Sequence, residues 1–246
     1  MIIKVLKNVP MITKEHNLSD VIVNTMKVNK IKVKNKDIIC VASKVVSITE
    51  NRIVSLSEYN PSQLALEIHE KVPRKDPRII QAIIEETGDF AGKRIDLGTN
   101  HIGAWLRNGL FLTSAGIDRY DENNIILLPL DADYCAKKIG ERIMKEFGVN
   151  VGVIITDSDG RVDKLGATQV AIGVYGIPPL RYNKAFDLIT KKEKQISETI
   201  CDMLAASAGL LMGQRGQNKP VVIISGFEFD FDKNSSINDS LYNKMK

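Results

Sequence analysis

Two aspartates stand where a divalent cation could be bound. Asp118 ends the segment TSAGID, and Asp157 follows an apolar run in IITDSDG, so each lies near a glycine at the border of an apolar segment. Ligand clefts form at strand ends, and Asp157 beside Ser158 offers hard oxygen ligands that suit magnesium or manganese better than zinc. These residues indicate a cation site, with capping of a helix or turn as the alternative role of either aspartate.

The segment MGQRGQNKP, residues 212–220, has the composition of an anion-binding loop. Its two glycines allow a ligand to approach the backbone closely. Its arginine and lysine can meet phosphate oxygens without a Walker loop. The alternative is a glycine cap at a helix end followed by an exposed polar turn, and the composition by itself favours that alternative. The residues concerned are Gly213, Gln214, Arg215, Gly216 and Lys219.

Several other chemical signatures are missing from the sequence. The segment GDFAGKR (88–94) has one residue too few between its glycines for a P-loop, and an arginine replaces the serine or threonine that holds magnesium. Neither a dinucleotide-binding G-x-G-x-x-G nor a G-x-S-x-G elbow is present. The histidines and cysteines lack metal-ligand spacing, and we expect the histidine at 69 to pack within a helix. These residues are His16, His69, His101, Cys40, Cys135 and Cys201.

Alternating helices and strands must position these segments. Apolar runs rich in Val and Ile predict buried strands over 37–47, 151–157, 167–180 and 221–229. Proline at the start predicts one helix with Asn60 as N-cap and Pro61 as first residue, and a second that runs from Pro77 and stops at Gly88. A third helix is predicted over 133–147, where a glycine follows its end. The spacing of apolar residues predicts a fourth over 191–212. Because no strict βαβ period repeats, we expect a mixed α/β fold that leans toward α+β. The polar tail, 233–246, is expected to be loose.

The composition is that of an ordinary globular protein, with 246 residues of which 43% are hydrophobic and 26% charged. The formal net charge is +4, and the lysines are interleaved with acidic and apolar residues, unlike the clustered basic stripe of a nucleic-acid binder. The first residues lack a signal-peptide pattern, and no apolar run nears the roughly 20 residues of a bilayer span. We therefore expect a cytoplasmic protein with no nucleic-acid or membrane partner.

The motifs, taken in chain order, resemble those of the γ-glutamyl ligases that extend the deazaflavin coenzyme F420. The segments that carry the resemblance are VPMI (9–12), VASKVVS (41–47), TSAGID (113–118), LLPLDAD (127–133), VGVIITDSDGR (151–161), VAIGVYGIPPL (170–180), and AASAGLLMGQ with PVVIISG in the last quarter. No single string is diagnostic, but their order and spacing together are specific. The resemblance implies the family's own mixed α/β fold and a homodimer. It also implies one catalytic unit over 1–246, with two intertwined subdomains as an open alternative.

The resemblance also implies the chemistry. It points to a nucleotide-dependent ligase, usually with GTP, that joins L-glutamate to an acidic small-molecule acceptor through an acyl phosphate, with two magnesium or manganese ions. Asp118 and Asp157 match the carboxylates of the first metal site and are the predicted catalytic residues, whereas Ser158 and Gln214 match the second site. The implied nucleotide contacts are Pro10, Met11, Ile12, Ser43, Lys44, Asp121, Met212, Gly213, Gln214, Arg215, Gly216 and Lys219.

Three positions depart from the family pattern. Ile48 stands where a lysine is usual, Asp121 replaces an asparagine, and residues 161–164 are RVDK instead of RPWR. The first two changes bear on nucleotide choice or affinity and the third on the acceptor. Two alternatives therefore stay open: the same ligation on a folate, pterin or other acceptor, and a non-catalytic homologue that still binds nucleotide and metal.

Overall fold

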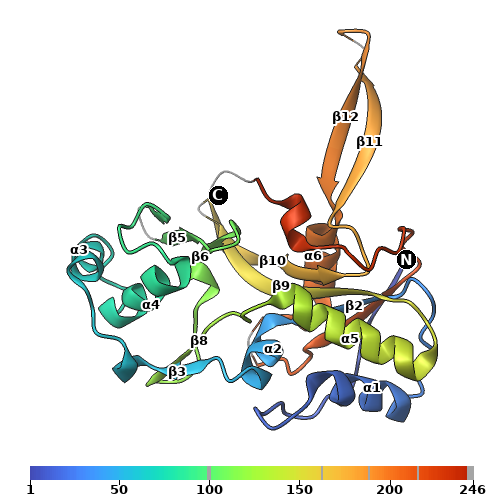
Figure 1. Ribbon diagram of the computed structural model, residues 1–246, viewed down its shortest axis with the longest axis horizontal. Helices are drawn as coiled ribbons and strands as arrows, with labels where there is room; N and C mark the ends of the chain where they lie inside the picture. Colours follow the sequence, from blue (N-terminus) through green and yellow to red (C-terminus); the bar gives the residue numbers. More distant parts are fainter. Residues whose placement is uncertain (99–100, 162, 188, 215, 243–246) are drawn as a thin grey trace.

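A five-stranded mixed sheet forms the centre of the molecule (Figure 1). The computed structural model describes residues 1–98, 101–161, 163–187, 189–214 and 216–242. The sheet has the order β1-β13-β2-β9-β10, in which β2 and β9 are parallel and the other neighbours antiparallel. Its strands are β1 (Ile2–Val5), β2 (Ile38–Ala42), β9 (Gly152–Arg161), β10 (Lys164–Tyr175) and β13 (Val221–Ser225). The predicted mixed α/β class is confirmed.

Helices cover both faces of this sheet because its strands carry apolar side chains on both sides. Ile39 and Val41 of β2 belong to the core beneath α1 and α5, whereas Ile38 and Cys40 belong to the core beneath α6. We call the sheet and its helices the body; the helices are α1 (Leu18–Val28), α2 (Ser43–Thr49), α5 (Ala132–Phe147) and α6 (Ile200–Met212). Among the described residues, every helix is too short or too polar to cross a lipid bilayer.

Residues 53–127 form a smaller region, which we call the lobe, beside the body (Figure 1). It has a core of its own, to which α4 contributes the fully buried Ile80 and Ile83. Two three-stranded sheets, β3-β8-β7 and β4-β5-β6, pack with two helices and two short 3-10 turns. The elements are β3 (Ile53–Ser55), η1 (Leu56–Glu58), α3 (Gln63–Lys71), α4 (Pro77–Thr87), β4 (Ile95–Leu97), β5 (Ile102–Trp105), β6 (Phe111–Thr113), η2 (Ser114–Gly116), β7 (Asp118–Arg119) and β8 (Asn124–Ile126).

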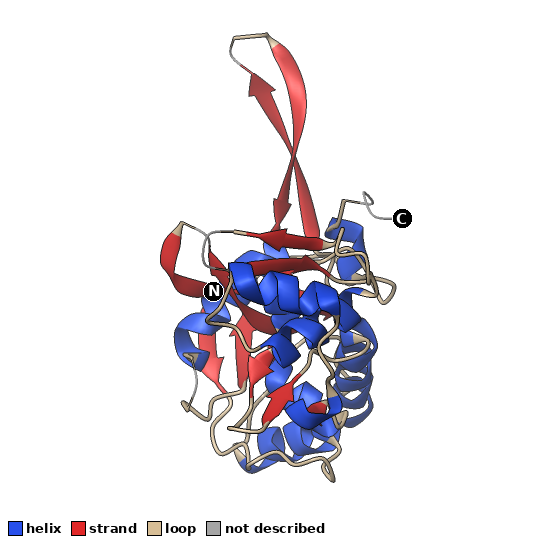
Figure 2. Ribbon diagram, turned by 90° about the vertical axis from the view of Figure 1, so that its left-hand side faces the viewer, coloured by secondary structure: helices blue, strands red, loops and turns tan. Residues whose placement is uncertain are grey.

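A two-stranded hairpin stands away from the body (Figures 1 and 2). It consists of β11 (Leu180–Asp187) and β12 (Lys192–Thr199), which form a sheet of their own. The helix predicted over 191–212 is therefore wrong for its first half, and α6 begins at Ile200. Residues 192–199 are mostly polar, and the one apolar side chain there, Ile196, is 49% exposed and marks no core-facing helical stripe.

The predicted boundaries were accurate where a cap marks them. Asp76 caps α4, which ends at the left-handed Gly88, and α5 likewise ends at Gly148, as predicted. The cap of α3, however, is Ser62 and not Asn60, because the Ser62 side chain accepts a hydrogen bond from the backbone of the helix. The strand predicted over 37–47 ends at Ala42, since the chain turns there into α2.

The segment after Asp232 packs against the body as far as η3 (Ile237–Ser240). Ile237 is buried, and Asp133 at the start of α5 accepts hydrogen bonds from the Ser236 hydroxyl (2.7 Å) and the Ile237 backbone. The loose tail predicted from residue 233 therefore does not begin there, and residues 243–246 lie outside the described residues.

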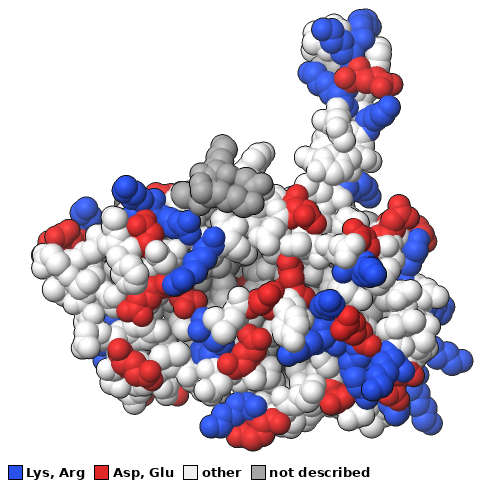
Figure 3. All heavy atoms as spheres, viewed as in Figure 1, with Lys and Arg blue, Asp and Glu red and all other residues white. Residues whose placement is uncertain are grey.

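Charged side chains of both signs are mixed over the surface. Figure 3 shows acidic and basic residues interleaved across the body and lobe on the face drawn, with several lysines and arginines on the projecting hairpin. This distribution agrees with the small net charge of +4.

Candidate active site

A cavity of about 970 Å³ opens beside the end of β2, where its parallel pairing with β9 stops at Ala42 and Thr156. The body brings α2, β9 and the chain before α1 to this point, and the lobe brings β7. Most of the predicted site residues line it, namely Pro10, Met11, Ile12, Ser43, Lys44, Asp118, Asp157, Ser158, Met212, Gly213, Gln214, Gly216 and Lys219. Segments from near both ends of the chain thus meet in one cavity.

The start of α2 holds both carboxylates. Ser43 Oγ donates a hydrogen bond of 2.5 Å to Asp157 Oδ1. The neighbouring Lys44 Nζ forms an ion pair of 2.8 Å with Asp118 Oδ2. Because Asp157 lies on the body sheet and Asp118 on the lobe, these two contacts tie the two regions together at the cavity.

The pKa of Asp157 is raised to about 7, and burial is the main cause. The hydrogen bond from Ser43 and the charge of Lys44 lower this pKa, and the negative charge of Asp118 contributes to raising it. A carboxyl group in this setting gains from any cation that replaces its proton. The strongly shifted pKa, inside a large cavity, marks Asp157 as a functional candidate.

The donor set suits a hard cation. The carboxylates of Asp118 and Asp157, the hydroxyl of Ser158 and the side-chain amide of Gln214 all offer oxygen ligands at the cavity. Within the described part of the chain, no group of three or more His, Cys, Asp or Glu residues is placed to hold a metal. Magnesium often takes only one or two protein carboxylates and completes its shell with water and phosphate oxygens. The residues therefore fit magnesium or manganese bound together with a phosphate ligand.

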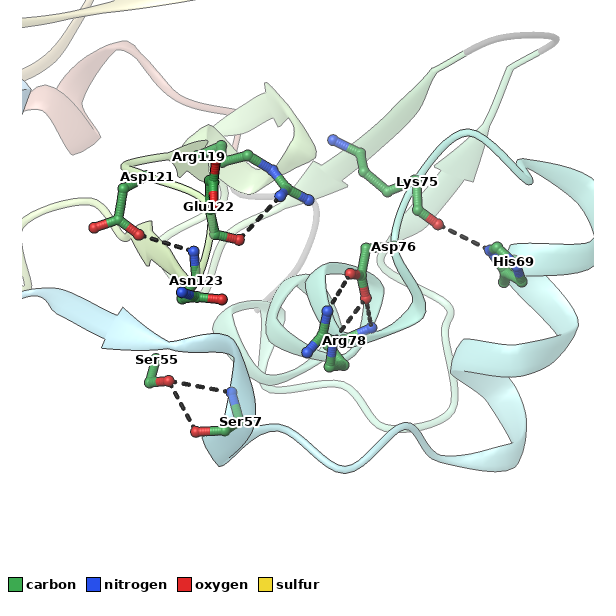
Figure 4. A network of polar contacts seen from close by, with 10 residues as sticks. All are labelled: Ser55, Ser57, His69, Lys75, Asp76, Arg78, Arg119, Asp121, Glu122 and Asn123. Atoms are coloured by element: carbon green, nitrogen blue, oxygen red, sulfur yellow. Dashed lines mark hydrogen bonds and ion pairs between the residues drawn. The ribbon is translucent and has the colours of Figure 1, made fainter.

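Asp121 is not among the residues that line the cavity. Its carboxylate instead accepts a hydrogen bond from the backbone of Asn123 (Figure 4). It also accepts hydrogen bonds from the backbone and side chain of Asn124, so the acidic side chain closes a local turn. Arg215 and Val162, which the sequence analysis also included, lie outside the described residues.

Other lining residues had weak or no sequence signals. Tyr120, which is 48% exposed, lies two residues after Asp118, and an exposed aromatic beside a predicted cation ligand could have been flagged. Asn51 comes from a polar stretch that nothing in the sequence distinguishes from surface, and Gln169 is a single polar residue near the start of the strand predicted over 167–180. Ile48 also lines the cavity, so an apolar side chain is present where the family resemblance implies a lysine.

A second, smaller chamber of about 300 Å³ adjoins the same carboxylates. It shares Asp118, Asp157 and Ser158 with the large cavity, and its opposite wall comes from the lobe. The charged and polar groups of that wall are Arg74, Lys75, Asp76, Thr113, Ser114 and Arg119. His69 supports this wall from outside, because its Nδ1 donates to the Lys75 carbonyl (2.9 Å; Figure 4), in keeping with its predicted packing role.

Comparison with known proteins gives consistent matches. The family model described as F420-0:Gamma-glutamyl ligase matches residues 7–226. The coenzyme F420:L-glutamate ligase of Methanosarcina mazei is 35% identical over 95% of this chain and 89% of its own length. The proteins of the same name from Methanothermobacter thermautotrophicus (37% identical, 78% of this chain and 75% of the relative) and Methanocaldococcus jannaschii (35%, 81% and 79%) are also similar.

These matches place the chain in the class of ligases that form carbon–nitrogen bonds. Within that class, the chain belongs to the F420-0:gamma-glutamyl ligase family. The resemblance inferred from the sequence motifs is therefore confirmed.

Proposed function

We propose that this protein joins L-glutamate to the carboxylate of a coenzyme F420 precursor, with GTP as cosubstrate. The names of the relatives supply the two substrates. The observation that carries the proposal is that Asp118, Asp157 and the glycine-containing loop after α6 line one cavity. Carboxylates for cations and a glycine loop for phosphates are what a nucleotide-driven ligation needs in one place.

The proposed reaction has two steps. An oxygen of the acceptor carboxylate attacks the γ-phosphorus of GTP, and GDP leaves with the electron pair of the broken P–O bond. The amine of L-glutamate then attacks the carbonyl carbon of the resulting acyl phosphate. Inorganic phosphate leaves, the amide C–N bond forms, and the attacking nitrogen releases a proton.

The residues that offer oxygen ligands at the cavity have a role in this scheme. Asp118 and Asp157, with Ser158 and Gln214, would hold two divalent cations, magnesium or manganese. When bound, such cations offset the charge that develops on the transferred phosphoryl group. Ser43 keeps the Asp157 carboxylate oriented through its 2.5 Å hydrogen bond.

The basic side chains act on the phosphates. Lys44, already fixed by its ion pair with Asp118, adds a positive charge beside the carboxylates. Lys219, at the far end of the loop, adds another within the same cavity. The backbone at Gly213 and Gly216 has positive φ angles of 67° and 80°, which lets this loop turn closely around a bound ligand. A carboxylate can approach the polyanionic nucleotide only when such charges offset the repulsion.

Ile48 favours the binding-only alternative. It lines the cavity, so this position contributes no cation to a bound nucleotide. Lys44 and Lys219 line the same cavity and can supply that charge, which is why we prefer the catalytic proposal. Neither observation fixes the acceptor, and a folate or pterin acceptor is an outcome that the experiment below distinguishes.

The homodimer belongs to the same proposal. The hairpin β11–β12 exposes Tyr182, Phe186 and Ile196, each at about half or more of its full area, on a ribbon that projects from the body (Figure 2). Isolated two-stranded hairpins are marginally stable in water, so a second copy that covers these side chains would stabilise the ribbon.

The three buried free cysteines, Cys40, Cys135 and Cys201, agree with the proposed cytoplasmic location.

An acceptor screen by mass spectrometry tests the function. The purified protein is incubated with L-glutamate, magnesium or manganese, GTP or ATP, and either the deazaflavin precursor or reduced folates. We expect a mass gain of one or more glutamyl units on the deazaflavin precursor, dependent on GTP and metal. A mass gain on a folate alone would show that a folate, and not the deazaflavin precursor, is the acceptor. No mass gain on any acceptor, with nucleotide binding retained, would establish the binding-only homologue.

A further inference from the structure

The smaller chamber adjoins the large cavity at the carboxylate pair and is otherwise lined by different residues. The two spaces share Asp118, Asp157 and Ser158, whereas the described loop residues 212–214 and 216–219 line only the large cavity. A ligand in the small chamber would therefore meet the nucleotide at the carboxylates and nowhere else. Its volume of about 300 Å³ is at the lower end of the range for ligand sites.

The lobe wall of this chamber is basic. Arg74, Lys75 and Arg119 all line it, and Figure 4 shows the side chains of Lys75 and Arg119 directed into the same region. The acid on this wall, Asp76, already forms an ion pair of 2.7 Å with Arg78. The positive charge of the wall is therefore only partly offset by the wall itself.

Lys75 is the least exposed of these cations. Its Nζ donates a 2.6 Å hydrogen bond to Ser114 Oγ, a neutral partner. Burial and the neighbouring charges of Arg74 and Arg119 lower its pKa, while Asp118 raises it. A half-buried ammonium whose hydrogen-bond partner is a neutral hydroxyl gains from an anionic ligand that adds countercharge.

The backbone fixes that hydroxyl in place. Ser114 and Ala115 both have φ angles of +53°, and Gly116 follows at +69°. Non-glycine residues rarely adopt this left-handed conformation, and such strain gathers at functional sites. A side chain at Gly116 would also meet Leu128, since an added Cβ would lie 2.5 Å from its Cδ1. The turn is thus built to hold Ser114 toward Lys75.

We propose that this chamber binds the incoming L-glutamate, with its carboxylates on Lys75, Arg74 and Arg119 and its amine toward the wall shared with the nucleotide cavity. The inference rests on the proposed function. Glutamate has the matching chemistry, because it carries two carboxylates for the basic wall and an amine that must reach the acyl carbon. A deazaflavin acceptor is far larger than an amino acid, so a small chamber favours the amino acid as occupant.

Direct binding of L-glutamate tests the inference without relying on catalysis. Equilibrium dialysis with radiolabelled L-glutamate is carried out on the full chain with magnesium and a non-hydrolysable GTP analogue. We expect Lys75→Met and Arg74→Gln each to raise the dissociation constant by about tenfold or more, the loss expected for a charge-assisted hydrogen bond. Lys75→Arg should retain most of the affinity. The matched control is Lys71→Met, an exposed lysine at the end of α3 that lines neither space.

Two further ligands define specificity. L-Glutamine, which lacks one carboxylate, should bind at least about tenfold more weakly than L-glutamate, and inorganic phosphate should not displace L-glutamate at equal concentration. Equal binding of L-glutamate by wild type, Lys75→Met and Arg74→Gln would overturn the inference, as would the absence of any binding to the wild type. Thermal unfolding midpoints show whether Lys75→Met is folded, and the exposed Arg74 provides a variant with little risk to the fold.

The two proposals can fail separately. If L-glutamate binds in a Lys75-dependent manner but no acceptor is glutamylated, the proposed function fails and the chamber assignment stands. If ligation proceeds and Lys75→Met leaves the KM for glutamate unchanged, the chamber assignment fails and the function stands.

Discussion

The body and the lobe meet at the cavity but are built differently. The body strands β9 and β10 have 10 and 12 residues and lie in a sheet with apolar cores on both faces. The lobe strands have two to four residues each and surround one core. Asp157 therefore stands on a rigid frame, whereas Asp118 and Lys75 depend on short strands and a strained turn. A site at such a seam combines a fixed part with an adjustable part.

The largest loss of ligation rate should come from a substitution in the body. Asp157→Asn should lower ligation by about 10³-fold or more, because the loss of a charged group that acts on the transition state has effects of this size. The rate is measured as glutamylated product over time, with Asp20→Asn, a surface ion-pair partner of Arg142, as the matched control. Near-normal turnover in Asp157→Asn would remove Asp157 from the proposed chemistry.

The stability of the lobe can be probed separately from that of the body. Ile83→Ala removes a fully buried side chain from the lobe core and should cost about 2–5 kcal/mol. Trp105, the single tryptophan, lies on β5 in the lobe, so its fluorescence follows the lobe while circular dichroism follows the whole chain. In denaturant, the fluorescence midpoint should fall further than the dichroism midpoint. Coincident transitions would show that the two regions unfold as one unit.

The pH dependence of metal binding should reflect the buried carboxyl group of the body. Because the pKa of Asp157 is about 7, protons compete with the cation below that pH. The dissociation constant for Mn²⁺, measured by electron paramagnetic resonance, should fall by about tenfold per pH unit as the pH rises toward 7 and then level off. A flat profile from pH 5 to 8 would contradict this. The stability of the metal-free protein should change in the opposite direction. Because the folded state holds the Asp157 proton more tightly than the unfolded state does, the free energy of unfolding should rise as the pH falls from 7 toward 4.

Two glycines with nearly equal φ angles allow the smallest expected difference in stability between the body and the lobe to be measured. Gly116 at the seam and Gly148 after α5 have φ angles of 69° and 68°. Alanine at either position costs about 1–2 kcal/mol for the backbone, but only at Gly116 does the new Cβ meet a packed side chain. Gly116→Ala should therefore lower the free energy of unfolding by about 1–2 kcal/mol more than Gly148→Ala, as measured by denaturation. Equal losses would mean that Leu128 moves aside freely.

The same contrast explains what the sequence could predict. The body strands are encoded locally by strong apolar runs, such as those around Ile39 and Ile154. The helix ends are encoded locally by capping residues, such as Asp76 and Gly148. The short lobe strands carry no such period, because their residues contribute to a core assembled from many elements. The second hairpin strand, β12, was mistaken for the start of a helix, since the two strands of the hairpin are stabilised by each other and not by an apolar face.

The site was predicted unevenly for a related reason. Motif resemblance identified the cavity residues around Asp118 and Asp157, because those segments carry the family pattern in the sequence. The basic wall escaped notice because Arg74 and Lys75 are two cations among many lysines and arginines. Only the fold brings them within one chamber with Arg119. Spatial convergence of ordinary charged residues leaves no local signature.

The order of strands also governs when the sheet can form during synthesis. β13, near the end of the chain, lies between β1 and β2, so the first strand pairs only with one of the last. During synthesis, β1 stays without its sheet partner until Val221–Ser225 has emerged, and β2, which can pair with β9 earlier, stays without its other neighbour. Such long-range pairing slows folding and extends the time during which apolar strands are exposed. We therefore expect β13 to be inserted between β1 and β2 as the closing strand of the sheet.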